Sequence, residues 1–331
     1  MADPAEELQA AILGGPEWYT RNEMAEATRL DQEQVAALWR AMGFPDVGDA
    51  RAFTDEDLSA LVRVSALIER GLVDVDGVVE LARSIGQNTA RLAEWQYDFL
   101  GRHVLGDLER TDMTPETFAT VKDEVAEVLP ELERLMDYVW RRQVAAIVAR
   151  EWVGFGDEAD EQDGPDIATV GFADLVSFTR LSRQLDEAEL GGLVETFESR
   201  SADLIHAESG RLVKTLGDEV MFLSETPHQA ANIAIALHET LAALENVPEI
   251  RVGLSTGPVL TRMGDVYGTT VNRASRYTAI ARPDSTVIDT ATSEALQSGP
   301  QADRFLVKAL TPRPVRGFGI VRPYSLAPRA E

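Results

Sequence analysis

Hydrophobic residues in the first half of the chain recur three and four positions apart, the spacing of a helix with one buried face. Helix start signals precede several of these runs, namely Thr20 with Glu23, Asp31 with Gln34, Thr54, and Thr114 before Pro115. The pattern predicts helices that begin at these caps, and further helices over 75–85, 92–108, 114–129 and 131–153. Residues 1–153 are therefore predicted to form an all-helical domain.

The period changes in the second half, where short apolar runs alternate with helical segments. Strands are predicted over 167–173, 211–215, 219–223, 250–256 and 286–289, with more near the C-terminus, and helices over 186–208, 227–244 and 271–280. The leading order β-α-β-β-α-β is that of a ferredoxin-like α+β sheet. Because that fold hosts many functions, the residues of the site must decide among them.

An acidic segment separates the two halves. Residues 156–166 contain six acidic residues and a Gly-Pro pair, and almost nothing apolar. Charge repulsion and the Gly-Pro pair predict an exposed linker. We therefore divide the chain into a helical domain (1–153), an acidic linker (154–166) and an α+β domain (167–331).

Composition narrows the class of protein. The chain has 331 residues, 31 basic and 56 acidic side chains, and a formal charge of −25. Such a charge opposes binding to nucleic acid or to an anionic membrane. The absence of cysteine excludes disulfides, thiol catalysis and cysteine-ligated zinc. No secretion signal and no apolar run of about 18 residues is present, so a soluble cytoplasmic protein without a membrane span is expected.

Two acidic residues follow predicted strands of the α+β domain. Asp174 comes after the first strand, and Asp218 lies in the tight turn of a predicted hairpin, behind Lys214. Magnesium bound to a polyphosphate usually takes one or two carboxylates and completes its shell with water and phosphate oxygens. The alternative interpretations are a helix N-cap for Asp174 and an ordinary Gly-Asp turn beside a solvated lysine for Asp218.

A third segment, 264–276, places Asn272 and Arg276 four residues apart on one helix face. An amide and a guanidinium together suit a sugar-phosphate group, and the arginine can stabilise charge on phosphoryl oxygens. A solvated helix face is the alternative interpretation.

Taken together, the three segments resemble the catalytic motifs of class III nucleotide cyclases. The shared pattern is Phe-x-Asp-Leu-x-x-Phe-Thr at 172–179, Lys-x-x-Gly-Asp at 214–218 and Asp-x-Tyr-Gly-x-x-Val-Asn-x-x-Ser-Arg at 265–276. The resemblance spans about half the chain and implies a cyclase catalytic domain behind a helical regulatory or dimerisation domain. It implies these roles: metal ligands Asp174, Asp218 and the Leu175 carbonyl; base recognition by Lys214 and Asp265; ribose orientation by Asn272; transition-state stabilisation by Arg276; and substrate contacts at Phe178, Thr179 and Arg316.

The resemblance also implies the reaction and the assembly. Lysine and aspartate match the acceptor N1 and the donor amine of adenine and oppose the polarity of guanine, so ATP is the expected substrate. The expected products are 3′,5′-cyclic AMP and pyrophosphate, formed with two divalent cations, Mg²⁺ or Mn²⁺. In the family each site straddles two catalytic domains, and this chain has one domain with both residue sets. A homodimer with two shared sites is therefore expected.

The helical half also resembles the helix-turn-helix region of MerR-type regulators, through segments beginning at Tyr19, Arg51 and Leu67. A DNA-binding regulator is therefore an alternative function, although the acidic charge opposes phosphate contacts. A catalytically silent interaction protein is a second alternative.

The helical domain could also regulate the other half of the chain. The sequence leaves open an unidentified small ligand on this domain. The helix 132–153 connects the two halves and could transmit a regulatory movement.

Overall fold

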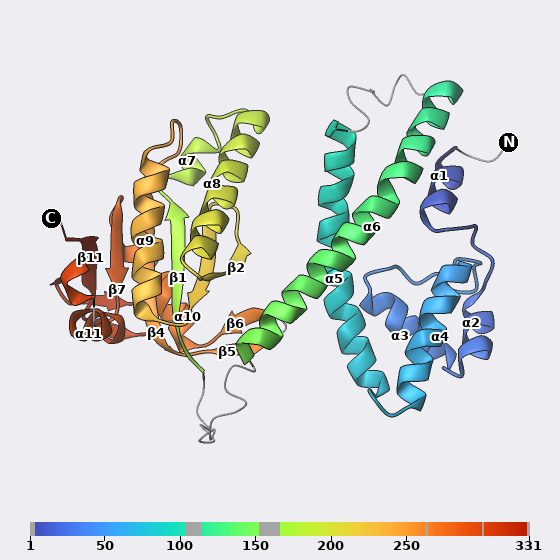
Figure 1. Ribbon diagram of the computed structural model, residues 1–331, viewed down its shortest axis with the longest axis horizontal. Coiled ribbons are helices and arrows are strands. Elements are labelled where there is room, and N and C mark those ends of the chain that lie inside the picture. Colours follow the sequence, from blue (N-terminus) through green and yellow to red (C-terminus); the bar gives the residue numbers. More distant parts are fainter. Residues whose placement is uncertain (1–3, 104–113, 152–165, 263, 300, 330–331) are drawn as a thin grey trace. The chain divides into compact units, whose positions relative to one another are not determined.

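The computed structural model describes residues 4–103, 114–151, 166–262, 264–299 and 301–329 (Figure 1). The chain divides into two compact units, residues 1–160 and 161–331. Within the described ranges, no helix combines the length and the apolar character needed to span a bilayer. The predicted acidic linker 154–166 lies outside the described residues except for Asp166.

Every element described in the first unit is a helix, apart from one isolated β-bridge between Tyr19 and Phe53. The helices are α1 (Pro4–Ile12), α2 (Arg21–Thr28), α3 (Gln32–Ala41), α4 (Asp55–Glu69), α5 (Val75–His103) and α6 (Pro115–Glu151). Complete capping boxes form at Thr20, Asp31 and Thr54, where the sequence predicts two capping boxes and, at Thr54, a helix cap. Met24, Val35, Leu38 and Phe53 lie at the centre of the small core that these helices enclose.

Two predicted helix breaks are absent. The helices predicted over 75–85 and 92–108 form one helix, α5, and those predicted on either side of Pro130 form one helix, α6. Gly86 lies at the first predicted break, where a Cβ would come within 2.3 Å of the Met42 carbonyl oxygen, so the glycine allows α5 to approach α3 closely. Pro130 removes one hydrogen bond, and the helix continues through it. The predicted ends at 108 and 153 lie outside the described residues.

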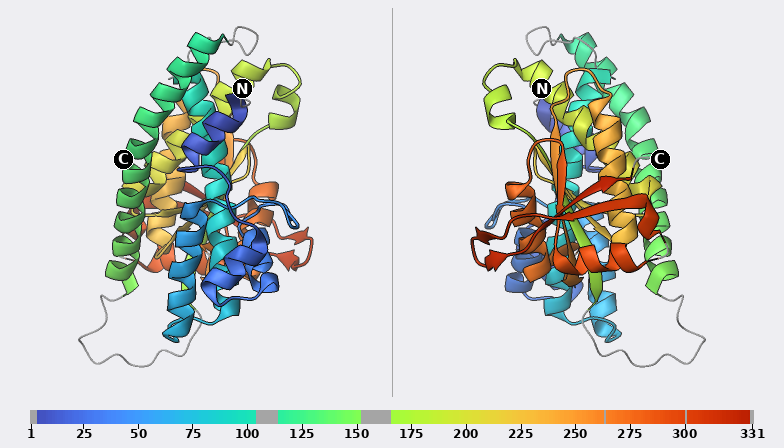
Figure 2. Two further views of the ribbon diagram at one scale, coloured as in Figure 1. Left: turned by 90° about the vertical axis from the view of Figure 1, so that its right-hand side faces the viewer. Right: turned by 90° about the vertical axis from the view of Figure 1, so that its left-hand side faces the viewer.

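The second unit is built on a seven-stranded mixed sheet in the order β2-β3-β1-β4-β7-β11-β8. Its strands are β1 (Ile167–Leu175), β2 (Arg211–Thr215), β3 (Glu219–Ser224), β4 (Ile250–Pro258), β7 (Ser285–Ile288), β8 (Phe305–Ala309) and β11 (Tyr324–Pro328). The order β2-β3-β1-β4 is the ferredoxin-like core that the element sequence predicts. The later strands extend one edge, and they appear in red and orange in the right-hand view of Figure 2.

Helices cover both faces of this sheet. The helices α8 (Glu187–Ala207), α9 (Pro227–Ala242) and α11 (Thr290–Ser298) pack on one face, where Phe197, Leu237 and Leu296 join the main core (Figure 1). The helix α10 (Thr269–Ile280) packs on the opposite face through Ala274, beside Phe172 and Met221. Because side chains alternate along a strand, Asp174 belongs to the α10 face and its neighbour Leu175 to the other.

The helices α7 (Phe178–Leu181) and α11 and the small hairpin β5–β6 (Leu260–Arg262 and Asp265–Tyr267) are not in the sequence prediction. A second small hairpin, β9–β10 (Arg313–Val315 and Gly319–Val321), belongs to the strands expected near the C-terminus. Asp289, predicted as the last residue of a strand, instead caps α11, and its side chain accepts a hydrogen bond from the Thr292 N–H.

Candidate active site

Asp174 lies inside β1, between two antiparallel neighbours. Its register partners are Glu219 on β3 and Arg251 on β4. The Asp174 carboxylate accepts a hydrogen bond from Arg251 at 2.5 Å, and the residue is only 8% exposed. Ser177 occupies the N-cap position of α7. The interpretation of Asp174 as a helix cap is therefore wrong, and Asp174 is a nearly buried charge held by a guanidinium.

Asp218 lies in the tight turn between β2 and β3, where Gly217 takes a positive φ of 77°. Its backbone carbonyl accepts a hydrogen bond of 2.9 Å from the Leu175 N–H. This bond joins the turn to the end of β1, so the backbone itself brings Asp218 close to Asp174. The charge of Asp218 is close enough to raise the pKa of Asp174.

Two further charged residues belong to this cluster, and the sequence analysis missed both. Glu219 directly follows Asp218, and Arg251 interrupts an apolar strand, which are the signals that could have found them. Burial, followed by the charges of Asp174 and Asp218, raises the pKa of Glu219 to about 7. Burial also raises the pKa of Asp174, against the opposing effect of Arg251. The cluster thus combines the Arg251–Asp174 ion pair with two neighbouring carboxyl groups, those of Asp218 and Glu219.

Lys214 and Asp265 form a direct ion pair between β2 and the β5–β6 hairpin. The Lys214 Nζ donates to both carboxylate oxygens of Asp265, at 2.7 and 2.9 Å. Burial alone would raise the pKa of Asp265, but the hydrogen bonds from Lys214 and from the Val266 N–H hold it below its usual value. Both side chains remain partly exposed, at 36% and 28%, so a ligand can reach them. The structure therefore brings together two residues that are 51 positions apart in sequence.

The helix α10 presents Asn272 and Arg276 to solvent. The helix begins after Gly268, whose φ of 134° suits a glycine, and the Asn272 N–H donates to the Gly268 carbonyl in its first turn. Both side chains are exposed, and neither has a side-chain hydrogen bond within the part of the chain that the structure describes. The predicted helical face is therefore present and open to a ligand.

The remaining predicted residues differ in exposure. Phe178 packs against the core on the α8–α9 face, so its side chain is structural and only its backbone could contact a substrate. Thr179 is exposed in α7, Leu175 is buried with its N–H already used, and Arg316 is exposed in the β9–β10 turn. Among the described residues, the Arg316 side chain forms no hydrogen bond and no ion pair.

Comparison with known proteins decides the family. Residues 161–327 match the model of the adenylate and guanylate cyclase catalytic domain. Over 99% of this chain and 92% of the relative, the sequence is 44% identical to an adenylate cyclase of Streptomyces coelicolor. An adenylate cyclase of Streptomyces griseus is 40% identical over 98% of this chain and 89% of the relative. The chain belongs to the adenylate and guanylate cyclase family. The predicted resemblance to class III cyclases is confirmed.

Among solved structures, the cyclase is similar to the adenylyl cyclase CyaB of Pseudomonas aeruginosa. The similarity has a TM-score of 0.44 with 20% identity, and it covers 51% of this chain and 97% of that one. The relatives from Streptomyces also extend over the helical unit, because they match nearly the whole chain.

The donor set of this cyclase suits hard divalent cations. Asp174 and Asp218 offer carboxylate oxygens, and magnesium requires no more than one or two carboxylates when phosphate and water complete its shell. Within the described ranges, no three His, Cys, Asp or Glu side chains converge to hold a metal without a substrate. The two carboxylates therefore fit a divalent cation whose remaining ligands come from a polyphosphate and water.

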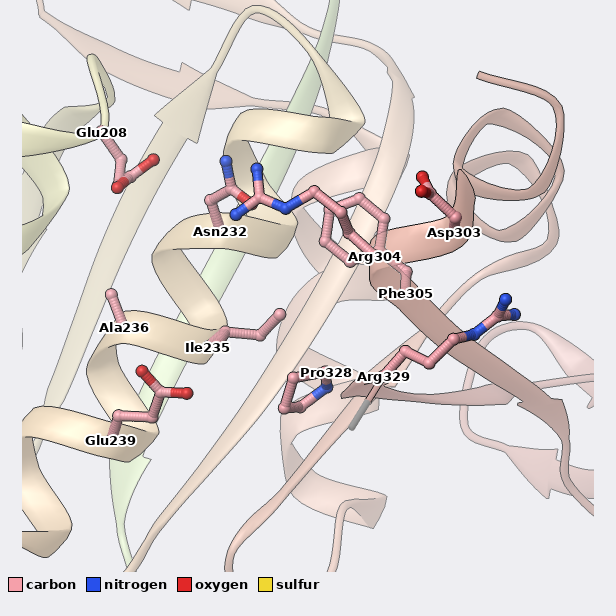
Figure 3. A pocket seen from close by; sticks show the side chains of 10 residues that line it. All are labelled: Glu208, Asn232, Ile235, Ala236, Glu239, Asp303, Arg304, Phe305, Pro328 and Arg329. Carbon is pink, nitrogen blue, oxygen red and sulfur yellow. The ribbon is translucent and has the colours of Figure 1, made fainter. Parts of the chain in front are cut away.

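A cavity of about 530 Å³ lies elsewhere on the cyclase unit, between α9 and the strands β8 and β11 (Figure 3). It is on the face covered by α8 and α9, and its lining includes none of the predicted site residues. The lining residues are Glu208, Asn232, Ile235, Ala236, Glu239, Asp303, Arg304, Phe305, Pro328 and Arg329.

Proposed function

We propose that this protein is an adenylate cyclase that converts ATP to 3′,5′-cyclic AMP and pyrophosphate. One observation carries the choice of nucleotide: the direct ion pair of Lys214 with Asp265, which joins a donor and an acceptor at an accessible position. Adenine can replace each partner of this pair, because N1 accepts from the lysine and the exocyclic amine donates to the aspartate. Guanine has the opposite polarity at both positions and would leave both charged groups unpaired.

The reaction is an intramolecular displacement at phosphorus. The ribose 3′-oxygen forms a bond to the α-phosphorus, the bond from that phosphorus to the bridging oxygen of the β-phosphate breaks, and pyrophosphate leaves with the electron pair. The hydroxyl proton passes to solvent. Asn272 orients the ribose, and Arg276 stabilises the charge that develops on the phosphoryl oxygens.

The carboxylate cluster holds the cations. Asp174 and Asp218 would bind two divalent ions, with the Leu175 carbonyl as a further ligand. Bound ions of this kind supply acidification of the 3′-hydroxyl and neutralisation of the leaving pyrophosphate. Arg251 now pairs with Asp174 at 2.5 Å. Arg251 would hold the Asp174 carboxylate in place beside such a cation, and its remaining guanidinium donors would suit a phosphate oxygen.

We further propose that the active enzyme is a homodimer with two shared sites. One chain would supply Asp174 and Asp218, and the other would supply Lys214, Asp265, Asn272 and Arg276. The exposure of Asn272 and Arg276 supports this arrangement, because both are available to a ligand held by a second chain. The helical unit would act as the regulatory or dimerisation module. Its arginines oppose a role in DNA binding, because Arg21 and Arg51 pair with acidic side chains of the same unit.

The proposal is tested by incubating the purified chain with ATP and Mg²⁺ or Mn²⁺ and measuring cyclic AMP. Asp174→Ala and Asp218→Ala should each abolish cyclisation, because the cations lose a ligand. Asp203→Ala, which removes an exposed carboxylate from α8, is the matched control and should remain active. Circular dichroism confirms that the variants are folded. Substantial metal-dependent activity in either site variant refutes the metal assignment, and absence of cyclic AMP from the wild-type chain favours a silent interaction protein.

A further inference from the structure

The helix α10 has two functional faces. Asn272 and Arg276 lie on its exposed face, and Arg273 and Tyr277 lie one position further along, on a face turned toward the body of the unit. Arg273 is half-buried and Tyr277 is 3% exposed. The position and rotation of the exposed face depend on what anchors the second face.

The anchor is Asp289, a carboxylate at the junction of β7 and α11 that is only 2% exposed. One of its oxygens accepts from the Thr292 N–H at 2.9 Å, from the Thr292 hydroxyl at 2.7 Å and from the Thr256 N–H at 3.4 Å. The other accepts from the Ser255 hydroxyl at 2.8 Å. A buried carboxylate fixed by donors from the strand β4 and from the first turn of α11 has little freedom to move.

Arg273 connects α10 to this anchor. Its guanidinium donates to the second oxygen of Asp289 at 3.2 Å. Tyr277 lies one helical turn later. Burial and the charge of the nearby Asp289 raise the pKa of its phenol.

Arg273 also reaches a second structure, the turn of the β9–β10 hairpin. Its guanidinium carbon lies 5.4 Å from the centroid of the Phe318 ring, within the range of a cation–π contact. Phe318 stands two residues after Arg316, and its N–H donates to the Val315 carbonyl across the turn. One side chain thus contacts α10's anchor and the turn that carries Arg316.

We propose that Arg273 is a positioning residue for the cyclase reaction. Held by Asp289 and Phe318, it fixes the rotation of α10 and thereby the place of Arg276 at the phosphoryl group. This inference rests on the proposed role of Arg276. No part of it requires Arg273 to touch the substrate, because its guanidinium is engaged by Asp289 and Phe318 on the inner face.

The expected effect follows from the length of the Arg276 side chain. Its guanidinium lies roughly 8 Å from the helix axis, given a Cα radius of about 2.3 Å and an extended side chain. A rotation of α10 by about 10° therefore displaces it by more than 1 Å. A displacement of about 1 Å can lower a rate by about 10²-fold. We expect Arg273→Met, which keeps the apolar stem and removes the charge, to lower kcat at least tenfold.

A double-mutant cycle separates positioning from simple loss of folded enzyme. The rates of Arg273→Met, Arg276→Ala and the double variant are compared with wild type in the full-length protein. If Arg273 acts through Arg276, its substitution costs at least tenfold in wild type and less than about twofold when Arg276 is already absent. An equal fold loss in both backgrounds overturns the proposal, as does an Arg273→Met variant with wild-type kcat.

Further variants cover the remaining outcomes. Arg273→Lys keeps the charge and loses the stacked guanidinium, so its kcat should lie between those of Arg273→Met and wild type, and a kcat no higher than that of Arg273→Met counts against the ion pair. Arg200→Met makes the same chemical change on an exposed position of α8 and should leave kcat unchanged. If Arg273→Met does not fold, Arg273→Gln, which also removes the charge, takes its place in the cycle with the same expected outcomes. A fully active Arg276→Ala single variant would overturn both this inference and the proposed role of Arg276. That result is distinct from an inactive Arg276→Ala with an additive Arg273 effect, which overturns the inference alone.

Discussion

Restoration of activity by mixing two inactive variants tests the shared site directly. Asp174→Ala removes a metal ligand, and Arg276→Ala removes the contact that stabilises the transition state. The two side chains share no partner in the described structure: Asp174 pairs with Arg251, and Arg276 is exposed. Each substitution therefore damages one half of a site and leaves the other half intact. In a mixed dimer with shared sites, one site collects both substitutions and the other collects neither.

The size of the recovery can be calculated. Asp174→Ala alone should be inactive, and loss of a preorganised transition-state contact lowers kcat by about 10²–10³-fold, so Arg276→Ala alone should retain roughly 1% or less. After random exchange of equal amounts, half of the dimers are mixed, and each mixed dimer has one intact site of two. Activity should approach roughly a quarter of the wild-type value, a rise of at least about 25-fold over either variant alone.

The assay measures cyclic AMP from the mixture over time, with subunit exchange followed through two different affinity tags. Co-expression replaces mixing if the preformed dimers do not exchange. Complete exchange without recovery of activity refutes the shared site. If each site were built from one chain, every site in the mixed dimer would still carry one of the two substitutions and would stay inactive. Lys214, Asp265, Asn272 and Arg276 would then belong to the metal site of the same chain.

Two further predictions concern single side chains of the site. The folded protein holds the Glu219 proton more tightly than the unfolded chain does, because folding raises the pKa of Glu219 from 4.5 to about 7. The contribution of Glu219 to stability is therefore complete below about pH 4.5 and is lost as the pH rises through 7. In metal-free buffer Glu219→Gln should become more stable relative to wild type as pH rises, by about 1–2 kcal/mol in urea unfolding once solvent screening of this partly exposed group is allowed for, and a difference that does not change with pH contradicts the assignment. Asp265→Ala should reduce the preference for ATP over GTP in kcat/KM at least tenfold, and an unchanged ratio would show that the Lys214–Asp265 pair does not read the base.

Local sequence signals determined much of the fold. The helix caps at Thr20, Asp31 and Thr54 appear where the sequence predicts them, because a cap depends on residues only three positions apart. The order β-α-β-β-α-β could also be predicted, because hydrophobic residues recur with a different spacing in strands than in helices. The motif residues were found for the same reason: each lies in a short segment with fixed spacing.

The tertiary structure alone decided how these segments meet. Local signals predicted breaks in α5 and α6, but packing continues α5 past Gly86 against α3, and the helical hydrogen bonds on both sides carry α6 through Pro130. From local sequence Asp174 could be interpreted as a helix cap. Its burial could not be seen there, because it depends on pairing with strands that bring Glu219 and Arg251, 45 and 77 positions away, beside it.

The same distinction separates the predicted site residues from those that support them. The motifs identify Asn272 and Arg276, which face outward and obey local spacing. Arg273, between them, looks like any helical arginine until the fold places the buried Asp289 and the partly exposed Phe318 against it. Burial and long-range charge pairing arise only when distant strands and helices are brought together, so sequence determined which groups could do the chemistry and the tertiary structure determined which groups hold them in place.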